Sequence, residues 1–321
     1  MFTSIEVCAG AGGQAIGLHQ AGFRHVALVE IDPHAAETLR RNGARTRWWK
    51  GSAVHETSLV GWVPPLEVGE IDLVAGGVPC PPFSIAGRQL GHEDERDLFP
   101  AILELVERVQ PRAVMIENVR GLLSKKFEPY RVRILKRLVR LGYEADWELL
   151  EAADFGVPQL RPRSILVAMR PDAWKSFKWP TPTERIVTVG GALYPLMAEG
   201  GWEGAEAWAA SASDIAPTLV GGSKKHGGAD LGPTRAKRAW SDRHGVDALG
   251  VADGPPQPGH GGMPKLTVPM AAVIQGFPSN WEFAGRKTAA YRQVGNAFPP
   301  PVARAVGKQI AKALRASDSA R

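Results

Sequence analysis

The sequence has few cysteines and lacks long apolar runs. Cys8 and Cys80 are its only cysteines in 321 residues, which is too few for a disulfide framework or a cysteine-based zinc site. We find neither an amino-terminal signal sequence nor a run of about 20 uncharged apolar residues that could span a bilayer. These absences favour a soluble intracellular protein without a structural metal.

The overall composition is that of an ordinary globular protein. Hydrophobic residues make up 44% of the chain and charged residues 22%, and the length suffices for two domains. The formal net charge of +6 favours a polyanionic partner. Many basic proteins bind no nucleic acid, so charge alone supports a nucleic-acid partner only modestly.

Predicted strands alternate with predicted helices over the first 170 residues or so. Short apolar runs at 4–8, 25–29, 71–75, 113–116 and 164–168 are typical of buried strands. This alternation predicts an α/β fold with a doubly wound sheet. Regular patterning is lost near residue 181 and resumes near 270, so we expect a discontinuous first domain (1–180 plus 270–321) and a smaller, loop-rich second domain (181–269).

Cys80 follows the predicted strand at 71–75, between Pro79 and Pro81. Open α/β sheets bind their ligands at the carboxyl ends of strands, and flanking prolines fix the backbone of the turn. The next strand along the chain brings Glu117 to the same edge. A packed cysteine beside a loop is the alternative, and for Pro79-Cys80 taken alone it is the better one.

A glycine turn follows the first predicted strand. Gly10, Gly12 and Gly13 allow a ligand to approach the backbone at the start of a helix, and Glu30 ends the second strand about 20 residues later. A glycine turn alone indicates only a tight connection. The turn, the spacing and the acid together predict a cofactor that contains a nucleoside, with Glu30 bonded to the ribose hydroxyls.

The ordered set of motifs resembles the cytosine-C5 DNA methyltransferases. It covers nearly the whole chain outside the second domain and comprises the glycine turn, Pro79-Cys80, Glu117-Asn118-Val119, Gln159-Leu160-Arg161-Pro162-Arg163, Gln275-Gly276-Phe277-Pro278 and Gln293-Val294-Gly295-Asn296. The resemblance implies a Rossmann-like methyltransferase fold, S-adenosylmethionine as cofactor with S-adenosylhomocysteine as product, and no metal.

The resemblance also implies the catalytic residues. The Cys80 thiolate adds to C6 of cytosine and leaves an enamine at C5 that can attack a sulfonium methyl. Glu117 gives a proton to N3, and Arg163 holds O2. Arg161 is counted with this catalytic set. An ion pair between Glu117 and Arg163 is the alternative, and the free enzyme can satisfy both interpretations.

The cofactor residues that the resemblance implies are Cys8, Gly10, Gly12, Gly13, Glu30, Ile31, Ser52, Pro79, Leu98 and Asn296. The chain departs from the family at Cys8, where phenylalanine is usual, and at Ser52, where aspartate is usual. A third departure is the segment Thr267 to Met270, where the family often has an arginine. The first two weaken the expected adenine contacts.

The target base must leave the duplex, so a closing loop over 81–97 is expected. Its expected phosphate contacts are Ser84 and Arg88. In the second domain Thr218-Leu219 resembles the family's Thr-Leu signature, and a local basic cluster supplies Lys224, Lys225, Arg235 and Arg238. A solvated loop is an equally good interpretation of the cluster. The cations Arg133, Lys136, Arg137 and Arg140 of a predicted helix are interpreted as a solvated face.

The expected partner is double-stranded DNA, with a monomeric enzyme in the bacterial cytoplasm at the nucleoid. The resemblance also allows a restriction endonuclease that acts on the same site without a stable complex. Two alternatives stay open at this point: a transfer-RNA cytosine-C5 methyltransferase, and a non-catalytic nucleic-acid-binding relative.

Overall fold

The computed structural model describes residues 1–65, 70–79, 97–183, 185–221 and 229–320. These residues form two compact units. Unit 1 comprises Met1–Leu150, Pro162–Thr181 and Val302–Arg321, and unit 2 comprises Glu151–Arg161 and Pro182–Pro301. No helix among the described residues is both long and apolar enough to cross a membrane.

Unit 1 is built on a seven-stranded sheet in the order β3-β2-β1-β4-β5-β7-β6. The neighbouring pairs from β3 to β5 are parallel, whereas β7 runs antiparallel to β5. The strands are β1 (Phe2–Val7), β2 (Phe23–Glu30), β3 (Val54–Glu56), β4 (Leu73–Gly77), β5 (Ala113–Val119), β6 (Glu144–Glu151) and β7 (Pro162–Met169). The predicted α/β sheet is confirmed.

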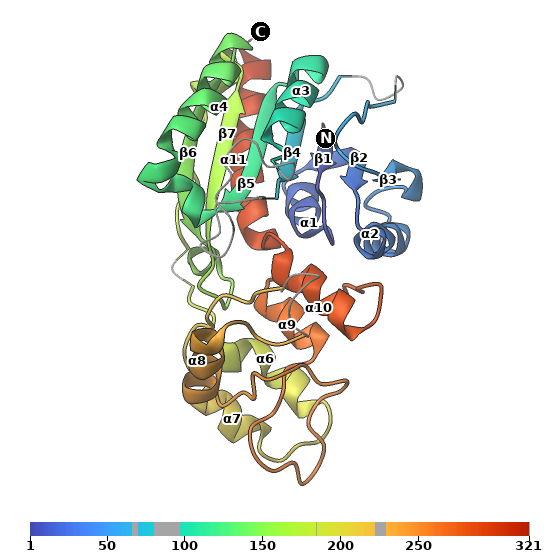
Figure 1. Cartoon of the computed structure of the whole chain (residues 1–321), viewed down its shortest axis with the longest axis vertical. Helices are drawn as coiled ribbons and strands as arrows, with labels where there is room; N and C mark the ends of the chain where they lie inside the picture. Colours follow the sequence, from blue (N-terminus) through green and yellow to red (C-terminus); the bar gives the residue numbers. More distant parts are fainter. Residues whose placement is uncertain (66–69, 80–96, 184, 222–228, 321) are drawn as a thin grey trace. The chain divides into compact units, whose positions relative to one another are not determined.

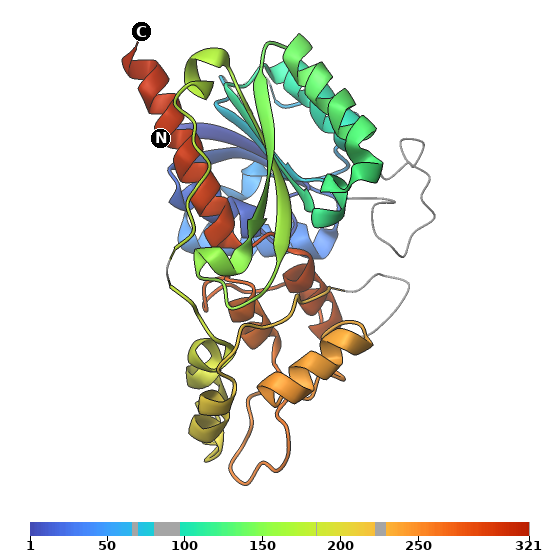
Figure 2. The same ribbon diagram turned by 90° about the vertical axis from the view of Figure 1, so that its left-hand side faces the viewer.

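Helices cover both faces of this sheet (Figures 1 and 2). On one face, α3 (Phe99–Val109) and α4 (Glu128–Arg140) pack on β1, β4, β5 and β7 through a common apolar core. In α3 the buried residues Phe99, Ile102, Leu105 and Val106 recur every three or four positions, which places them on one side of the helix. The remaining helices of the unit are α1 (Gly13–Gln20), α2 (Pro33–Thr46), the short α5 (Pro171–Trp174) and α11 (Pro300–Ser319).

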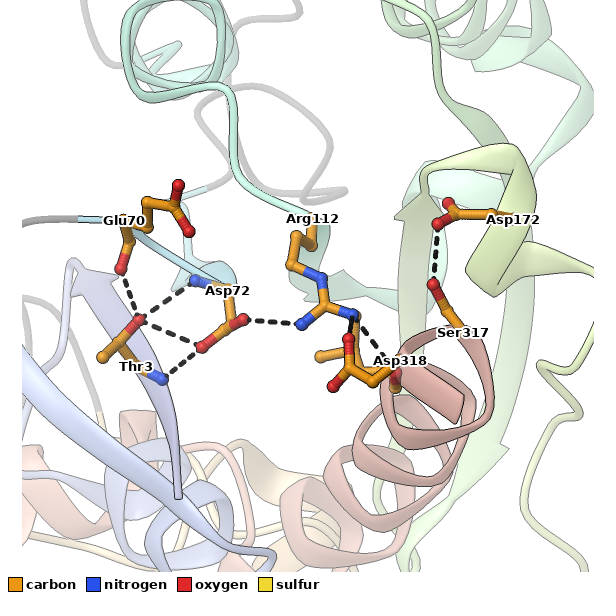
Figure 3. A network of polar contacts seen from close by, with 8 residues as sticks. Thr3, Glu70, Asp72, Arg112, Asp172, Ser317 and Asp318 are labelled. Carbon is orange, nitrogen blue, oxygen red and sulfur yellow. Dashed lines mark hydrogen bonds and ion pairs between the residues drawn. The ribbon is translucent and has the colours of Figure 1, made fainter. Parts of the chain in front are cut away.

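A polar network ties the carboxyl-terminal helix to the amino ends of the strands (Figure 3). Arg112, just before β5, pairs with Asp72 at 3.1 Å and with Asp318 of α11 at 2.5 Å, and it donates to the carbonyl of Leu314. Asp72 in turn accepts from the backbone N–H of Thr3 in β1 at 2.7 Å. One guanidinium thus connects three segments that lie far apart in the sequence.

Unit 2 contains five helices among its described residues: α6 (Val189–Ala198), α7 (Ala205–Ser211), α8 (Thr234–His244), α9 (Val268–Ile274) and α10 (Lys287–Asn296). The first three lie in the stretch that the sequence predicted to be loop-rich. They escaped prediction because they are short, and because Pro195 lies inside α6 and glycines flank all three. Residues 151–161 and 270–301, which were expected in the first domain, cluster with unit 2, where α9 contacts α6 and α10.

Candidate active site

Two catalytic candidates meet at the carboxyl end of β5. Glu117 and Arg163 form an ion pair, with Nε of Arg163 2.7 Å from Oε1 of Glu117. Antiparallel pairing of β5 with β7 sets Val119 opposite Arg163, which brings the arginine beside the last residues of β5. Each side chain is only 13% exposed, so the pair is largely shielded from water.

The glycines at the end of β4 make room for this pair. Gly77 lies opposite Glu117 in the sheet, and a Cβ there would stand 3.0 Å from Oε2 of Glu117. A Cβ on Gly76 would collide with Val7 at 2.7 Å. Sequence analysis assigned no role to either glycine, although a Gly-Gly pair at the end of an apolar strand is itself a signal of close approach.

Asn118 fixes the turn that leads to the predicted nucleophile. It is 2% exposed and donates through Nδ2 to the carbonyl of Val78 at 3.2 Å, while its Oδ1 accepts from the N–H of Val119. Pro79 is exposed and ends the described part of this turn. Cys80, Ser84 and Arg88 lie outside the described residues.

The predicted cofactor loop has the backbone that its glycines suggest. Cys8, Gly10 and Gly12 all have positive φ angles, of 51°, 54° and 89°. Gly12 is the left-handed N-cap of α1, which starts at Gly13, and no side chain caps this helix. A Cβ on Gly10 would meet nothing within 4 Å, so the loop borders open space. A helix amino terminus beside such space suits an anionic group of a ligand.

Glu30 holds this loop in place. Its Oε2 accepts from the N–H of Gly10 and its Oε1 from the N–H of Asp32, both at 2.7 Å. Burial raises the pKa of Glu30, although the two backbone donors oppose that shift. Burial, together with the nearby carboxyl groups of Glu30 and Glu6, raises the pKa of Cys8 to about 12, so Cys8 is a protonated, unreactive thiol at neutral pH.

Three further residues of unit 1 are expected to contact the cofactor. Ile31, next to Glu30, is 68% exposed and can offer its side chain to a planar ring. Leu98 is the N-cap of α3 and packs partly on the core. Ser52 belongs to a 3₁₀ turn (Gly51–Ala53), of which the structure describes the backbone but not the Ser52 side chain. The open glycine loop, the carboxylate of Glu30 that is held by two backbone N–H groups, and the exposed Ile31 fit a nucleoside-containing methyl donor.

Arg161 has a different environment from Arg163. It is 1% exposed, and within unit 2 its guanidinium donates to the carbonyls of Leu219 and Gly295 at 2.7 Å and of Ala297 at 3.1 Å. Gln159 joins the same network by donating to Gln275 Oε1 and accepting from the N–H of Leu219. Arg161 therefore organises the interior of unit 2 and presents no surface to a substrate.

The Thr-Leu pair is attached to this network. Leu219 is completely buried, while Thr218 is partly exposed and its hydroxyl donates to the carbonyl of Leu160 at 2.6 Å. Of the two, only Thr218 can reach a ligand. Asn296, the last residue of α10, is exposed, and the residues on both sides of it receive the Arg161 hydrogen bonds.

The predicted basic cluster of unit 2 is only partly described. Lys224 and Lys225 lie outside the described residues. Arg235 and Arg238 are exposed on α8. Their neighbours are neutralised, because Lys237 pairs with Asp230 at 2.6 Å and Arg243 with Asp214 at 3.7 Å.

The chain is similar to known methyltransferases both by a family model and by individual sequences. The model of the family "C-5 cytosine-specific DNA methylase" matches residues 2–312. The chain is 58% identical to the type II methyltransferase M.NaeI of Lentzea aerocolonigenes, over 97% of this chain and 75% of that protein. It is 51% identical to the type II methyltransferase M.NgoMIV of Neisseria gonorrhoeae, over 98% of both.

Among solved structures, a candidate DNA modification methyltransferase encoded within an Escherichia coli prophage matches with a TM-score of 0.68. The alignment covers 98% of this chain and all of that one, at 22% identity. At this identity the likeness concerns the fold alone.

Proposed function

The chain belongs to the C-5 cytosine-specific DNA methylases, and on this basis we propose that Cys80, Glu117 and Arg163 carry out its reaction. It is a DNA (cytosine-5)-methyltransferase that uses S-adenosylmethionine. The single observation that supports the assignment of residues is the shielded Glu117–Arg163 pair at the carboxyl end of β5. Cys80 follows the adjacent strand β4 by three residues.

Cytosine C5 is a weak nucleophile, so the chain must push electrons onto it. The Cys80 thiolate adds to C6, and Glu117 donates a proton to N3, which takes up the electron pair displaced from the ring. Arg163 donates hydrogen bonds to O2 and stabilises negative charge there. When bound, S-adenosylmethionine supplies the methyl group that C5 accepts. Loss of the C5 proton to a base then reforms the double bond and expels Cys80 as a thiolate.

The cofactor would lie on the loop between β1 and α1. Gly10, Gly12 and Gly13 would approach its methionine part, with Leu98 and Asn296 also on that side. Ile31 would contact the adenine ring. Both oxygens of Glu30 already bind backbone N–H groups, and each keeps a further lone pair that can accept from a ribose hydroxyl.

We further propose the biological setting. The chain acts as a monomer of a type II restriction-modification system in the bacterial cytoplasm, alongside an endonuclease that reads the same site without forming a stable complex. Both type II relatives match over at least 97% of the chain, which supports this setting. Unit 2 would read the target sequence through Thr218, Arg235 and Arg238, and the closing loop would contribute Ser84 and Arg88.

Two assays test this function. Purified protein with methyl-labelled S-adenosylmethionine should label duplex DNA and leave transfer RNA unlabelled. Expression in a host without cytosine methylation, followed by genome-wide mapping, should place 5-methylcytosine at one position of one short sequence. Labelling of transfer RNA alone would reject DNA as the substrate, and a protein that binds DNA but labels neither nucleic acid would be a non-catalytic relative.

A further inference from the structure

The positive charge of this protein is concentrated in one short segment. Residues 120–140 contain eight Lys and Arg and a single Glu, a net charge of +7, whereas the whole chain carries +6. The remaining 300 residues together are therefore close to neutral, at −1. On helix α8 of unit 2, by contrast, two of the cations are already neutralised in ion pairs.

Three of the eight cations in this segment have structural roles. Arg131 donates from Nη1 to the carbonyls of Leu122 and Ser124, at 2.5 and 2.9 Å, and so fixes the two 3₁₀ turns before α4. Arg137 pairs with Glu107 of α3 at 3.0 Å. Arg133 lies over the ring of Tyr130, with its guanidinium carbon 5.6 Å from the ring centre.

The other five cations, Arg120 among them, are exposed. Two of the five make local contacts: Nζ of Lys126 lies 5.7 Å from the ring centre of Phe127, and Nε of Arg140 donates to the carbonyl of Lys136 at 3.3 Å. Lys125 and Lys126 lie on the second 3₁₀ turn, and Lys136 and Arg140 lie on the outer face of α4. Within the described part of the chain, none of these four forms an ion pair. Because Arg131 donates to the carbonyls of Leu122 and Ser124, it fixes the backbone that leads into the 3₁₀ turn of Lys125 and Lys126.

This basic segment starts at the catalytic edge of the sheet. Arg120 directly follows β5, the strand that ends in Glu117, Asn118 and Val119. From there the 13 residues of α4 extend over about 20 Å, at 1.5 Å per residue. That length matches more than half a turn of B-DNA, which advances about 34–36 Å per turn. The helix runs back along the sheet toward the amino end of β5, where Tyr143, just beyond α4, donates to the carbonyl of Pro111. Lys125 and Lys126 therefore follow the catalytic edge closely in the chain, and Lys136 and Arg140 lie toward the other end of the strand.

We propose that Lys125, Lys126, Lys136 and Arg140 form a sequence-independent contact surface for the phosphates of duplex DNA. The surface belongs to unit 1 and is separate from the residues of unit 2 that would read the target. It would hold the enzyme on DNA of any sequence while the target is sought, because phosphate contacts carry no base information. This inference rests on the proposed function in taking duplex DNA as the polyanion.

An apolar groove on the same helix makes it possible to distinguish DNA from an acidic protein helix as the partner. Val132, Leu135 and Val139, with Lys136 and Arg140, line a depression of about 440 Å³. Val132 is 40% and Val139 63% exposed. An acidic protein helix would use these valines as well as the cations, whereas phosphates need the cations alone.

The experiment replaces Lys125, Lys126, Lys136 and Arg140 with Gln in one variant. The matched control replaces four exposed cations elsewhere in unit 1, namely Lys175, Arg304, Lys308 and Lys312. A third variant carries Val132→Ser and Val139→Ser. Affinity for a duplex without a target site is measured by fluorescence anisotropy from 50 to 300 mM salt, and methyl transfer to a target duplex is measured for every protein.

We expect the first variant to bind non-target duplex at least about tenfold more weakly at low salt. Its log–log salt slope should fall by about 0.9 for each phosphate contact removed. The control and the valine variant should bind as wild type does, and methyl transfer at saturating DNA should persist in all three. An unchanged salt slope in the first variant, or an equal loss in the control, would overturn the inference. An equal loss in the valine variant would also overturn it, since the apolar groove would then be the contact. A wild type that binds duplex DNA without methylating it would instead count against the proposed function.

Discussion

The Nε atom of Arg163 lies 2.7 Å from Oε1 of Glu117, and neither side chain is more than 13% exposed. Without a substrate, the positive charge of Arg163 and the negative charge of Glu117 compensate each other. In the proposed mechanism, O2 of the cytosine would accept from Arg163, and N3 would accept from Glu117 once that carboxyl group is protonated.

Replacement of Glu117 with Gln should remove the proton donor but keep the shape of the site. We expect the rate of methyl transfer to fall by about 10²- to 10⁴-fold, because an amide can bond to N3 but cannot protonate it. Single-turnover labelling of target duplex measures this loss. Glu107→Gln, which changes the acid of the exposed Arg137 pair, is the control and should leave the rate unaltered. A Glu117→Gln enzyme as fast as wild type would show that N3 protonation comes from elsewhere.

Arg161 should prove to be a structural residue of unit 2. Arg161→Lys keeps the charge but cannot reach the carbonyls of Leu219, Gly295 and Ala297 together. We expect the free energy of unfolding to fall by about 3 kcal/mol or more, as measured by urea denaturation, because buried acceptors lose their donor. Arg243→Lys, at a 67% exposed site in the same unit, should change it by less than about 0.5 kcal/mol. Equal stability of Arg161→Lys and wild type would refute this role.

The Arg112 network should matter for stability and not for catalysis. Arg112→Ala removes the pairs with Asp72 and Asp318 at the end of the sheet opposite Glu117 (Figure 3). We expect a loss of about 1–3 kcal/mol, seen as a lower melting temperature, with an unchanged rate of methyl transfer below that temperature. Asp318→Asn keeps an acceptor and should cost less. Loss of activity in a fully folded Arg112→Ala protein would contradict this view.

His25 should make the fold sensitive to acid. The ring is buried between Ser4 and the carbonyl of Ala15, and this burial lowers its pKa from 6.5 to about 4. The unfolded chain takes up a proton near pH 6.5 that the folded protein refuses, so stability is full above pH 6.5 and falls as the pH drops toward 4.

The expected loss from His25 over that window is about 3 kcal/mol. It is measured as the difference in urea midpoints between wild type and His25→Gln at several pH values. Gln can still donate to Ala15 but does not titrate, so the variant should show a shallower acid slope. His34→Gln, at an exposed position, should keep the wild-type slope. Parallel slopes for wild type and His25→Gln would contradict the assignment.

Local patterns predicted much of the fold and the positions of two candidate site residues at strand ends. The apolar runs of β1, β2, β4, β5 and β7 were visible because strands buried on both faces are nearly continuous in apolar residues. Glu117 and Glu30 were identifiable because each directly follows such a run. The three-residue β3 escaped prediction because it is too short to show a period.

Long-range contacts could not be predicted in this way. Arg161 was grouped with Arg163 because the two are adjacent in one motif, yet the partners of Arg161 come from carbonyls 58 to 136 residues away. Arg112 and Asp318 are separated by 206 residues. The charge of residues 120–140 is plain in the sequence, but only the structure separates its paired cations from its exposed ones.

A duplex with 5-fluorocytosine at the target position tests the covalent step at Cys80 most directly. Fluorine cannot leave as a proton, so the bond between Cys80 and C6 cannot be released after methyl transfer. We predict a denaturation-resistant adduct whose mass spectrum places the DNA on Cys80 and not on Cys8, the only other cysteine. Cys80→Ser should form no adduct and transfer no methyl group, while it still binds S-adenosylmethionine. A fully active Cys80→Ser enzyme, or a wild type that methylates cytosine but is never trapped, would contradict the mechanism.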